Sequence, residues 1–336
     1  MADFVHLHLH TEYSLLDGAC RINELVGYIE TLGQKAVAIT DHGCMYGAVE
    51  FYKACKAKGI KPIIGCEVYV APRSRFDKVH KIDNAPYHLV LLCENEEGYQ
   101  NLIQLVSASY IEGFYGKPRV DRELLQKHHS GLIALSACLA GEIPRSLVSG
   151  NYQEAVESAR FYQQLFGKGN YFIELQNHGL EEQVRILPYL NRLSSELGIP
   201  MVATNDCHYI RKEDARIQKV LTSIQMNQTV DSENSLGFST DEFYVKSAEE
   251  MEKLFGAYEG ALENTVKIAE RCQFDFEFGV TKLPHFTAPD GMDNVEYFVD
   301  LCRKGLEEKY RGHLTEEIRS RLDYEISVIC KMGYVD

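Results

Sequence analysis

Short apolar runs alternate with amphipathic stretches through residues 1–206. Four of the amphipathic stretches have apolar residues at helical spacing, end at a glycine and lead into an apolar run. These glycines are Gly33, Gly59, Gly167 and Gly198. Glycine just past a helix supplies the left-handed cap at little cost. Near-continuous apolar runs between helices are typical of parallel strands buried on both faces. The pattern therefore predicts repeated strand–helix units.

Seven apolar runs qualify as strands of such units. They cover residues 4–10, 36–42, 62–71, 88–95, 131–138, 171–177 and 200–206. Seven parallel strands can form an open doubly wound sheet or a closed barrel. The placement of ligand-type residues, described below, favours the barrel.

After His208 the pattern becomes helical. Residues 213–225 have helical spacing, and Ser247–Glu250 is a capping box that predicts a helix through about Cys272. The stretch 283–291 contains proline and glycine and predicts a connection. A last helix carries an apolar stripe of Ile318, Leu322, Ile326 and Ile329. Because this stripe has no evident partner, we expect the chain to be a fragment of a longer protein.

Composition is that of an ordinary globular protein. Apolar residues make up 45% of the 336 positions and charged residues 25%, which is enough to bury a substantial core. No apolar run approaches the roughly 20 residues of a membrane helix, and no basic-then-apolar signal segment opens the chain. The ten cysteines include no CxxC pair, which predicts reduced thiols. We therefore expect a cytoplasmic protein with no membrane association.

The net charge of −14 argues against a general nucleic-acid-binding surface. It does not exclude an acidic substrate, because several divalent cations in one cleft would reverse the local potential.

Residues of metal-ligand type lie near the predicted strand ends. Side chains alternate across a strand, so His8 and His10 should leave the same face, with Leu7 and Leu9 on the other. Two histidines with this spacing can bind one metal ion, although the pattern alone is a weak signal. Six further residues that can bind metal ions lie on or next to other predicted strands: His42, Glu67, His88, Cys138, Asp206 and His208. Barrels place their active sites at the carboxyl ends of the strands, and by these boundaries only His88 lies at a strand start.

Together these segments resemble a known family, the PHP (polymerase and histidinol phosphatase) domains. The matching motifs are HLHT at 8–11, TDHG at 40–43, GCEVYV at 65–70, YHLVLL at 87–92, LSAC at 135–138 and TNDCHY at 204–209. The similarity is greatest to the branch of the family that opens the catalytic subunit of bacterial replicative polymerases. It covers residues 1 to about 275 and continues weakly to the end.

The resemblance implies a distorted seven-stranded (βα) barrel of the TIM type, with a helical C-terminal extension. We accordingly expect a metallohydrolase barrel over residues 1–275. Residues 276–336 would be a connector and the truncated start of a polymerase region. The positions of the polymerase's catalytic aspartates would lie beyond this sequence, so the chain itself should not polymerise DNA.

The resemblance also implies three metal positions. His8, His10, Glu67 and Asp206 would hold the first ion. Glu67 would bridge to a second, with His88 and Cys138. Asp17, His42 and His208 would hold a third, and the assignment of Asp17 depends most on the family. Mixed N, O and S donors suit Zn²⁺, and Mn²⁺ or Fe²⁺ remain open because only one donor is sulfur.

The reaction expected from such a site is phosphoester hydrolysis, since bridged metals can activate water and clamp both oxygens of an in-line displacement. By resemblance, it would be 3′→5′ exonuclease proofreading on a DNA 3′ end. Glu67, Asp206 and His208 would carry the catalysis. Four further residues are candidate substrate contacts: Arg73, Arg75, His178 and Arg211. Partners would be the remainder of the polymerase chain and other replicase subunits.

Three alternatives remain open from the sequence. The domain could be a small-molecule phosphoesterase, or a structural and docking module of the replicase. An amidohydrolase barrel would also begin with HxH, but no lysine is suitably placed on the fourth predicted strand to form a bridging carbamate.

Overall fold

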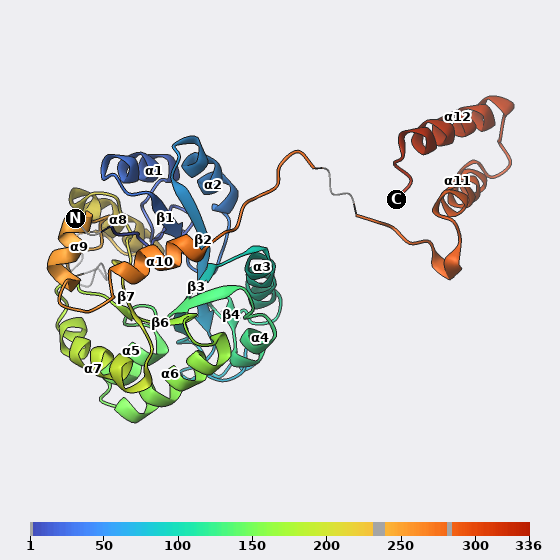
Figure 1. The fold of residues 1–336 in the computed structure, drawn as a ribbon. Coiled ribbons are helices and arrows are strands. Elements are labelled where there is room, and N and C mark those ends of the chain that lie inside the picture. The colour runs from blue at the N-terminus through green and yellow to red at the C-terminus, as the bar shows by residue number, and fades with distance from the viewer. Residues whose placement is uncertain (1–2, 231–238, 281–283) are drawn as a thin grey trace. The chain divides into compact units, whose positions relative to one another are not determined.

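The computed structural model describes residues 3–230, 239–280 and 284–336. The chain divides into two compact units, Met1–Phe276 and Glu277–Asp336. The first unit contains the whole sheet (Figure 1). The second contains two helices, α11 (Asn294–Tyr310) and α12 (Glu316–Met332), with the short turn η2 (Pro289–Gly291) before them. The predicted last helix is therefore confirmed.

One curled sheet forms the centre of the first unit, with strand order β1-β2-β3-β5-β6-β7 and β4 paired with β2. The strands are β1 (Ala36–Ile39), β2 (Lys61–Val70), β3 (Tyr87–Cys93), β4 (Arg119–Val120), β5 (Leu132–Leu135), β6 (Tyr171–Leu175) and β7 (Met201–Ala203). Six of the seven predicted strands are confirmed in position, most with shorter ends. β4 was not predicted, because a strand of two residues is too short to show an alternating or apolar pattern.

The expectation that all strands run parallel is wrong for β3. This strand pairs antiparallel with both β2 and β5, with Glu67 opposite Val90 and Leu91 opposite Ala134. A parallel return needs a crossover of a dozen or more residues, usually a helix. Residues 71–86, between β2 and β3, form no helix, so the chain turns back beside the strand it has left.

The predicted strand at residues 4–10 is also not regular. The segment bends at His8 and makes isolated bridges to two different neighbours, His6 to Val37 and Leu9 to Cys207. The His10 amide donates to the Cys207 carbonyl, and the Ala38 amide donates to the His6 carbonyl. The segment thus joins β1 to the residues that follow β7 and closes the curl of the sheet into a distorted barrel.

Ten helices among the described residues belong to this unit, and they surround the strands in Figure 1. They are α1 (Ile22–Thr31), α2 (Ala48–Ala57), α3 (Glu96–Ile111), α4 (Arg122–Lys127), α5 (Glu142–Val148), α6 (Tyr152–Phe166), α7 (Glu181–Leu197), α8 (Ala215–Gln225), α9 (Ala248–Phe255) and α10 (Glu263–Arg271). A short turn, η1 (Lys212–Asp214), precedes α8. No helix in the described part of the chain is both long and apolar enough to cross a membrane.

Local sequence signals explain several helix ends. Gly33 and Gly198 follow α1 and α7 with φ of 71° and 64°, as a left-handed cap requires. Ser247 accepts a hydrogen bond from the Glu250 amide and opens α9 with the predicted capping box. The single helix expected from there to Cys272 is wrong, because residues 256–262 separate α9 from α10.

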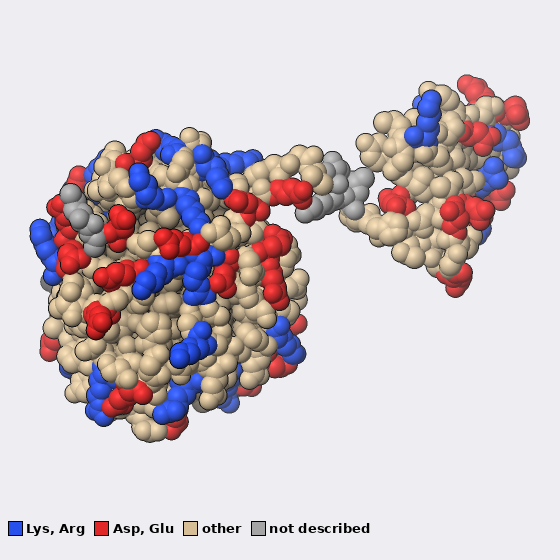
Figure 2. Space-filling model, in the orientation of Figure 1, with Lys and Arg blue, Asp and Glu red and all other residues tan. Residues whose placement is uncertain are grey.

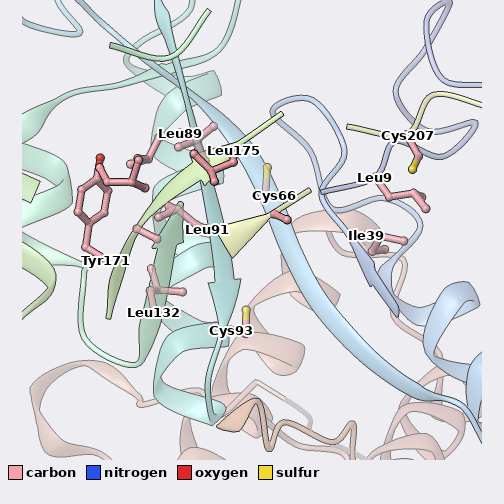
Figure 3. Close-up of a cluster of buried hydrophobic side chains, with 14 of the residues drawn as sticks. Leu9, Ile39, Cys66, Leu89, Leu91, Cys93, Leu132, Tyr171, Leu175 and Cys207 are labelled. Carbon is pink, nitrogen blue, oxygen red and sulfur yellow. The ribbon is translucent and has the colours of Figure 1, made fainter. Parts of the chain in front are cut away.

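Two apolar layers hold the barrel together. The larger packs the outward faces of the strands against the helices, and Figure 3 shows part of it, including Ile39, Leu91 and Leu175. The smaller fills the inside of the barrel with side chains such as Ile63 and Val202, and α10 covers it. Some of these inner residues, such as Ala36 and Ile63, lie toward the amino ends of the parallel strands, and polar side chains gather in the interior at the carboxyl ends.

Charges of both signs are interspersed on the face of the protein shown in Figure 2.

Gly18 lies in the loop that connects residue 11 to α1, and a test of this loop follows from its packing. A Cβ at Gly18 would lie 2.1 Å from the Thr11 carbonyl oxygen, whereas a Cβ at Gly27 in α1 meets nothing within 4 Å. We expect Gly18→Ala to lower the free energy of unfolding by about 1–3 kcal/mol through overpacking. The matched Gly27→Ala should be neutral or stabilise by roughly 0.5–1 kcal/mol. Urea titration of both variants measures the difference, and equal midpoints would contradict the packing described for this loop.

Candidate metal centre

The nine predicted ligand residues gather at one end of the barrel. Glu67 lies on β2, His88 at the start of β3, and Asp206 and His208 follow β7. The antiparallel direction of β3 explains His88, because its first residues pair with the last residues of β2, His88 opposite Tyr69. His88 therefore lies at the same end of the barrel as the carboxyl ends of the parallel strands.

Glu67 is the centre of the cluster. Its side chain is fully buried. Oε1 lies 3.2 Å from His8 Nε2 and 2.9 Å from His88 Nδ1, and Oε2 lies 2.5 Å from His42 Nδ1. Burial opposes its ionisation, but His88 and His42 outweigh that effect and hold the pKa of Glu67 well below its ordinary value. The Glu67 side chain is therefore a buried anion.

His10 presents an unprotonated nitrogen to this anionic cluster. Ser14 Oγ donates to Asp41 Oδ1 at 2.7 Å, so it must accept from His10 Nδ1 at 3.1 Å. Burial, with His42 and His208 nearby, lowers the pKa of His10 to about 3, so the ring is neutral. His10 Nε2 then directs a lone pair at Asp206 Oδ1, 3.0 Å away. Two electron-rich atoms in such contact need a cation between or beside them.

His8 has a matching arrangement on the other side of Asp206. Its Nδ1 lies 2.7 Å from Glu174 Oε1, on β6, and its Nε2 lies 3.1 Å from Asp206 Oδ1. Burial disfavours the imidazolium, yet Asp206 and Glu174 hold the pKa of His8 well above its ordinary value. Without a metal ion, a proton on His8 supplies the positive charge that the carboxylates require.

Five buried side-chain atoms in this cluster lie at ion-pair distance from one another, yet they make no hydrogen bond of normal geometry among the described residues. They are His8 Nε2, His10 Nε2, His42 Nδ1, Glu67 Oε2 and Asp206 Oδ1. Buried polar atoms are normally paired, and an unpaired one costs about 1–3 kcal/mol. Atoms that converge and remain unpaired indicate a bound group that satisfies them. Three overlapping sets have ligand atoms within 4.8 Å of one another: His8–His10–Asp206, His42–Glu67–His88 and His10–His42–His208.

Asp17 joins the cluster from the loop before α1. Its Oδ2 lies 3.0 Å from His42 Nε2 and 3.6 Å from His208 Nε2, and its Oδ1 accepts from Gln218 at 2.9 Å. Burial raises the pKa of Asp17, but His208 and His42 more than offset it, so the carboxyl is ionised. The structure thus brings Asp17, His42 and His208 together.

Cys138 lies beside Glu67 and His88. Its Sγ is 3.9 Å from Glu67 Oε1 and 3.6 Å from His88 Nδ1. Burial, together with Glu67 and Asp206, raises the pKa of this thiol well above its ordinary value. Only a cation in the site would favour the thiolate, the form that binds metals.

A pocket of about 360 Å³ opens onto the cluster. Its floor includes Asp17, His42, His88, Asp206 and His208, and its walls include four tyrosines and Lys117. This volume is within the range of small-ligand sites.

The four predicted substrate contacts do not line this pocket. Arg73 pairs with Asp83 at 2.6 Å, and Arg75 is buried against Glu112 and Asp121. Both ring nitrogens of His178 are engaged, by Asn205 O and Gln183 Nε2, and Arg211 lies over the Tyr28 ring. Arg75 and His178 are thus held by partners within the fold. The substrate-binding role of these four residues therefore stays a prediction, and their positions outside the pocket do not support it.

The sequence interpretation missed Glu174 and Ser14, which orient His8 and His10. Glu174 did carry a signal, because it is the only charged residue of the apolar run YFIEL. Carboxylates that fix a histidine's second nitrogen are common behind metal sites. Asp41 in turn accepts from Ser14 Oγ and from the Thr11 amide, both at 2.7 Å, and so holds the serine that contacts His10.

Comparison with known families identifies the class. The PHP domain model matches residues 6–178, just over half of the chain, and the chain belongs to the PHP domain family. The resemblance stated from the motifs is therefore confirmed.

The chain is homologous to part of the DNA polymerase III subunit alpha of several bacteria. It is 49% identical to that of Treponema pallidum over 334 residues, covering 99% of this chain and 28% of the relative. It is 45% identical to that of Thermus aquaticus over 323 residues, covering 93% of this chain and 26% of the relative. The chain thus spans little more than a quarter of the length of these relatives.

Among solved structures, one match is a two-domain protein from Bacteroides vulgatus, described as containing a predicted PHP-like metal-dependent phosphoesterase. It is 17% identical with a TM-score of 0.36, covering 61% of this chain and 52% of that one.

The double substitution His8→Ala with His10→Ala tests the cluster as a metal centre. We expect the metal content of the purified chain to fall, because two nitrogens with no other described hydrogen-bond partner are removed. The adjacent pair His128 and His129, outside the cluster and partly exposed, provides the matched control as a double alanine variant. Unchanged metal stoichiometry in the first variant would refute the assignment.

Glu174→Gln tests the orienting carboxylate separately. Glutamine keeps the size and one acceptor oxygen but loses the charge that faces His8 Nδ1. Loss of such partners typically weakens metal binding by about 10–100-fold. We expect a drop of that order in competitive chelator titrations, with Glu157→Gln on the exposed face of α6 as control. Equal affinities for Glu174→Gln and the parent chain would show that Glu174 has only a packing role.

Proposed function

We propose that this chain is a metal-dependent phosphoesterase domain whose reaction is 3′→5′ exonuclease hydrolysis of DNA. The observation that carries the proposal is the convergence of buried ligand atoms at one end of the barrel, with His10 Nε2 3.0 Å from Asp206 Oδ1, beside an open pocket. Family membership and the polymerase relatives support the choice of a DNA phosphodiester as substrate.

We propose three divalent cations as the cofactors, with Zn²⁺ the first candidate and Mn²⁺ or Fe²⁺ as alternatives. The sets would be His8–His10–Glu67–Asp206, then Glu67–His88–Cys138, then Asp17–His42–His208. The residues fit these groups, because the two Glu67 oxygens contact different histidines, Oε1 with His88 and Oε2 with His42. Asp17 and Glu67 likewise flank the two nitrogens of His42.

Bound divalent ions would supply Lewis-acid activation of a water molecule and neutralise the phosphate charge. The protein's own contribution is to hold that arrangement. Glu67 and Asp206 keep the buried floor anionic, and Glu174 and Ser14 fix the two histidine rings. Asp206 and His208 line the pocket, so they would lie beside a phosphate bound there.

We further propose that the chain acts in the cytoplasm as one region of a replicative polymerase α subunit. Its partners would be the 3′ end of DNA, the rest of that subunit and other replicase subunits. Similarity over 99% of the chain to DNA polymerase III subunit alpha supports this context.

Digestion of a 5′-labelled single-stranded oligonucleotide in Mn²⁺ or Zn²⁺ tests the activity. We expect products shortened stepwise from the 3′ end, loss of activity with chelator, and loss in Asp206→Asn. Differential scanning fluorimetry should show a lower unfolding temperature after chelation, because the buried carboxylates lose their cations. Metal-loaded protein that is stabilised by metal but digests no 3′ end would favour a docking module. Turnover of a nitrophenyl phosphate without digestion of the oligonucleotide would favour a small-molecule phosphoesterase.

A further inference from the structure

The rim of the metal pocket is aromatic. Tyr46, in the loop between β1 and α2, is 61% exposed, and Tyr110, near the end of α3, is 39% exposed. Both line the pocket that opens onto the metal cluster. Isolated exposed apolar side chains are ordinary, whereas a group of them beside a polar pocket indicates a binding surface.

Tyr46 and Tyr110 line the same pocket although they come from separate elements. Burial and a hydrogen bond with Tyr46 raise the pKa of the Tyr110 phenol. On its other side, the Tyr110 ring stacks with Phe114 at a centroid distance of 6.3 Å and an interplanar angle of 23°. The next residue, Ile111, is 82% exposed. Tyr110 is therefore packed on one neighbouring ring, and both tyrosines keep part of their surface exposed to solvent.

A cation completes the pocket wall. Lys117 is the only lysine or arginine among the described residues that line the pocket, and its Nζ lies 5.2 Å from the centre of the Tyr69 ring. Tyr69 in turn stacks on His42 and meets His88 edge-on. The order from floor to rim is therefore metal-ligand residues, then a buried tyrosine with a lysine, then exposed tyrosines.

This order matches the order of groups in a nucleotide. A phosphate requires cations, and a nucleobase stacks on aromatic rings with little dependence on its identity. A base can stack on these rings only when it is not paired and stacked in a duplex. The pocket thus suits the end of a single strand better than a duplex or a small aliphatic phosphate.

We propose that Tyr46 and Tyr110 form a stacking platform for the base of the 3′-terminal nucleotide, which makes unpaired ends the preferred substrate. The proposal rests on the phosphoesterase function proposed above and adds the residues that select the substrate.

The test compares two single-stranded oligonucleotides that are identical except at the 3′ residue, which carries a base in one and is abasic in the other. Both have a phosphorothioate at the last linkage, to slow hydrolysis, and a 5′ fluorophore. Fluorescence anisotropy in Mn²⁺ measures binding to the full chain. Because stacking contributes about 1–3 kcal/mol per base, the parent chain should bind the base-bearing end roughly 5- to 150-fold more tightly. Tyr46→Ala and Tyr110→Ala should reduce this ratio toward one.

Two controls separate stacking from other effects. Tyr46→Phe keeps the ring and should keep most of the ratio. Tyr189→Ala removes a tyrosine that is 47% exposed on α7, away from this pocket, and should leave the ratio unchanged.

Equal binding of the two ends by the parent chain, or an unchanged ratio in both Tyr46→Ala and Tyr110→Ala, would overturn the proposal. The same oligonucleotides with ordinary linkages report hydrolysis. Discrimination in binding without any hydrolysis would therefore reject the exonuclease function and retain the stacking platform.

Discussion

The Glu67 carboxylate is the interaction on which the site depends. It is fully buried on β2 and lies within 4 Å of ring nitrogens from four histidines: His8, His10, His42 and His88. A buried charge is stable only when it is paired and hydrogen-bonded. The barrel satisfies this condition by bringing imidazoles from separate segments of the chain to one carboxylate. The same condition also makes the site sensitive to its cation content, because protons or metal ions must balance the carboxylates.

The fold supplies this convergence through its two apolar layers. The inner layer packs the barrel interior from the amino ends of the parallel strands up to the level of Glu67, and the polar side chains of the cluster are buried next to it. Buried carboxylates such as Glu67, Glu174 and Asp206 are unfavourable for folding unless they are compensated. Such groups are retained where function requires them, and the barrel core provides the stability that offsets their cost.

Much of this arrangement could be predicted from the sequence, because periodicity and glycine caps are local signals. Strands β2, β5 and β6 and the caps at Gly33 and Gly198 follow from such signals. The direction of β3 could not be predicted, because an apolar run reads the same in either direction. That direction decides where His88 lies. The alternation of side chains along residues 4–10 did not predict the bend at His8 either. Leu7 and Leu9 were expected on the same face of a strand, but Leu7 lies in the inner apolar layer and Leu9 in the outer one.

Substrate-contacting residues could not be predicted from the sequence, because their role depends on which side chains they pair with in the fold. A basic residue after a strand is equally compatible with a substrate phosphate and with a buried carboxylate, and only tertiary contacts distinguish them. Arg75 pairs with Glu112 and Asp121, the second of which lies 46 positions away in sequence. Lys117, which does line the pocket, belongs to a segment with no strand or helix periodicity. Ligand-type residues are easier to predict than substrate contacts, because a metal ion demands several converging donors whereas a phosphate can be held by any cation that the fold leaves near the pocket.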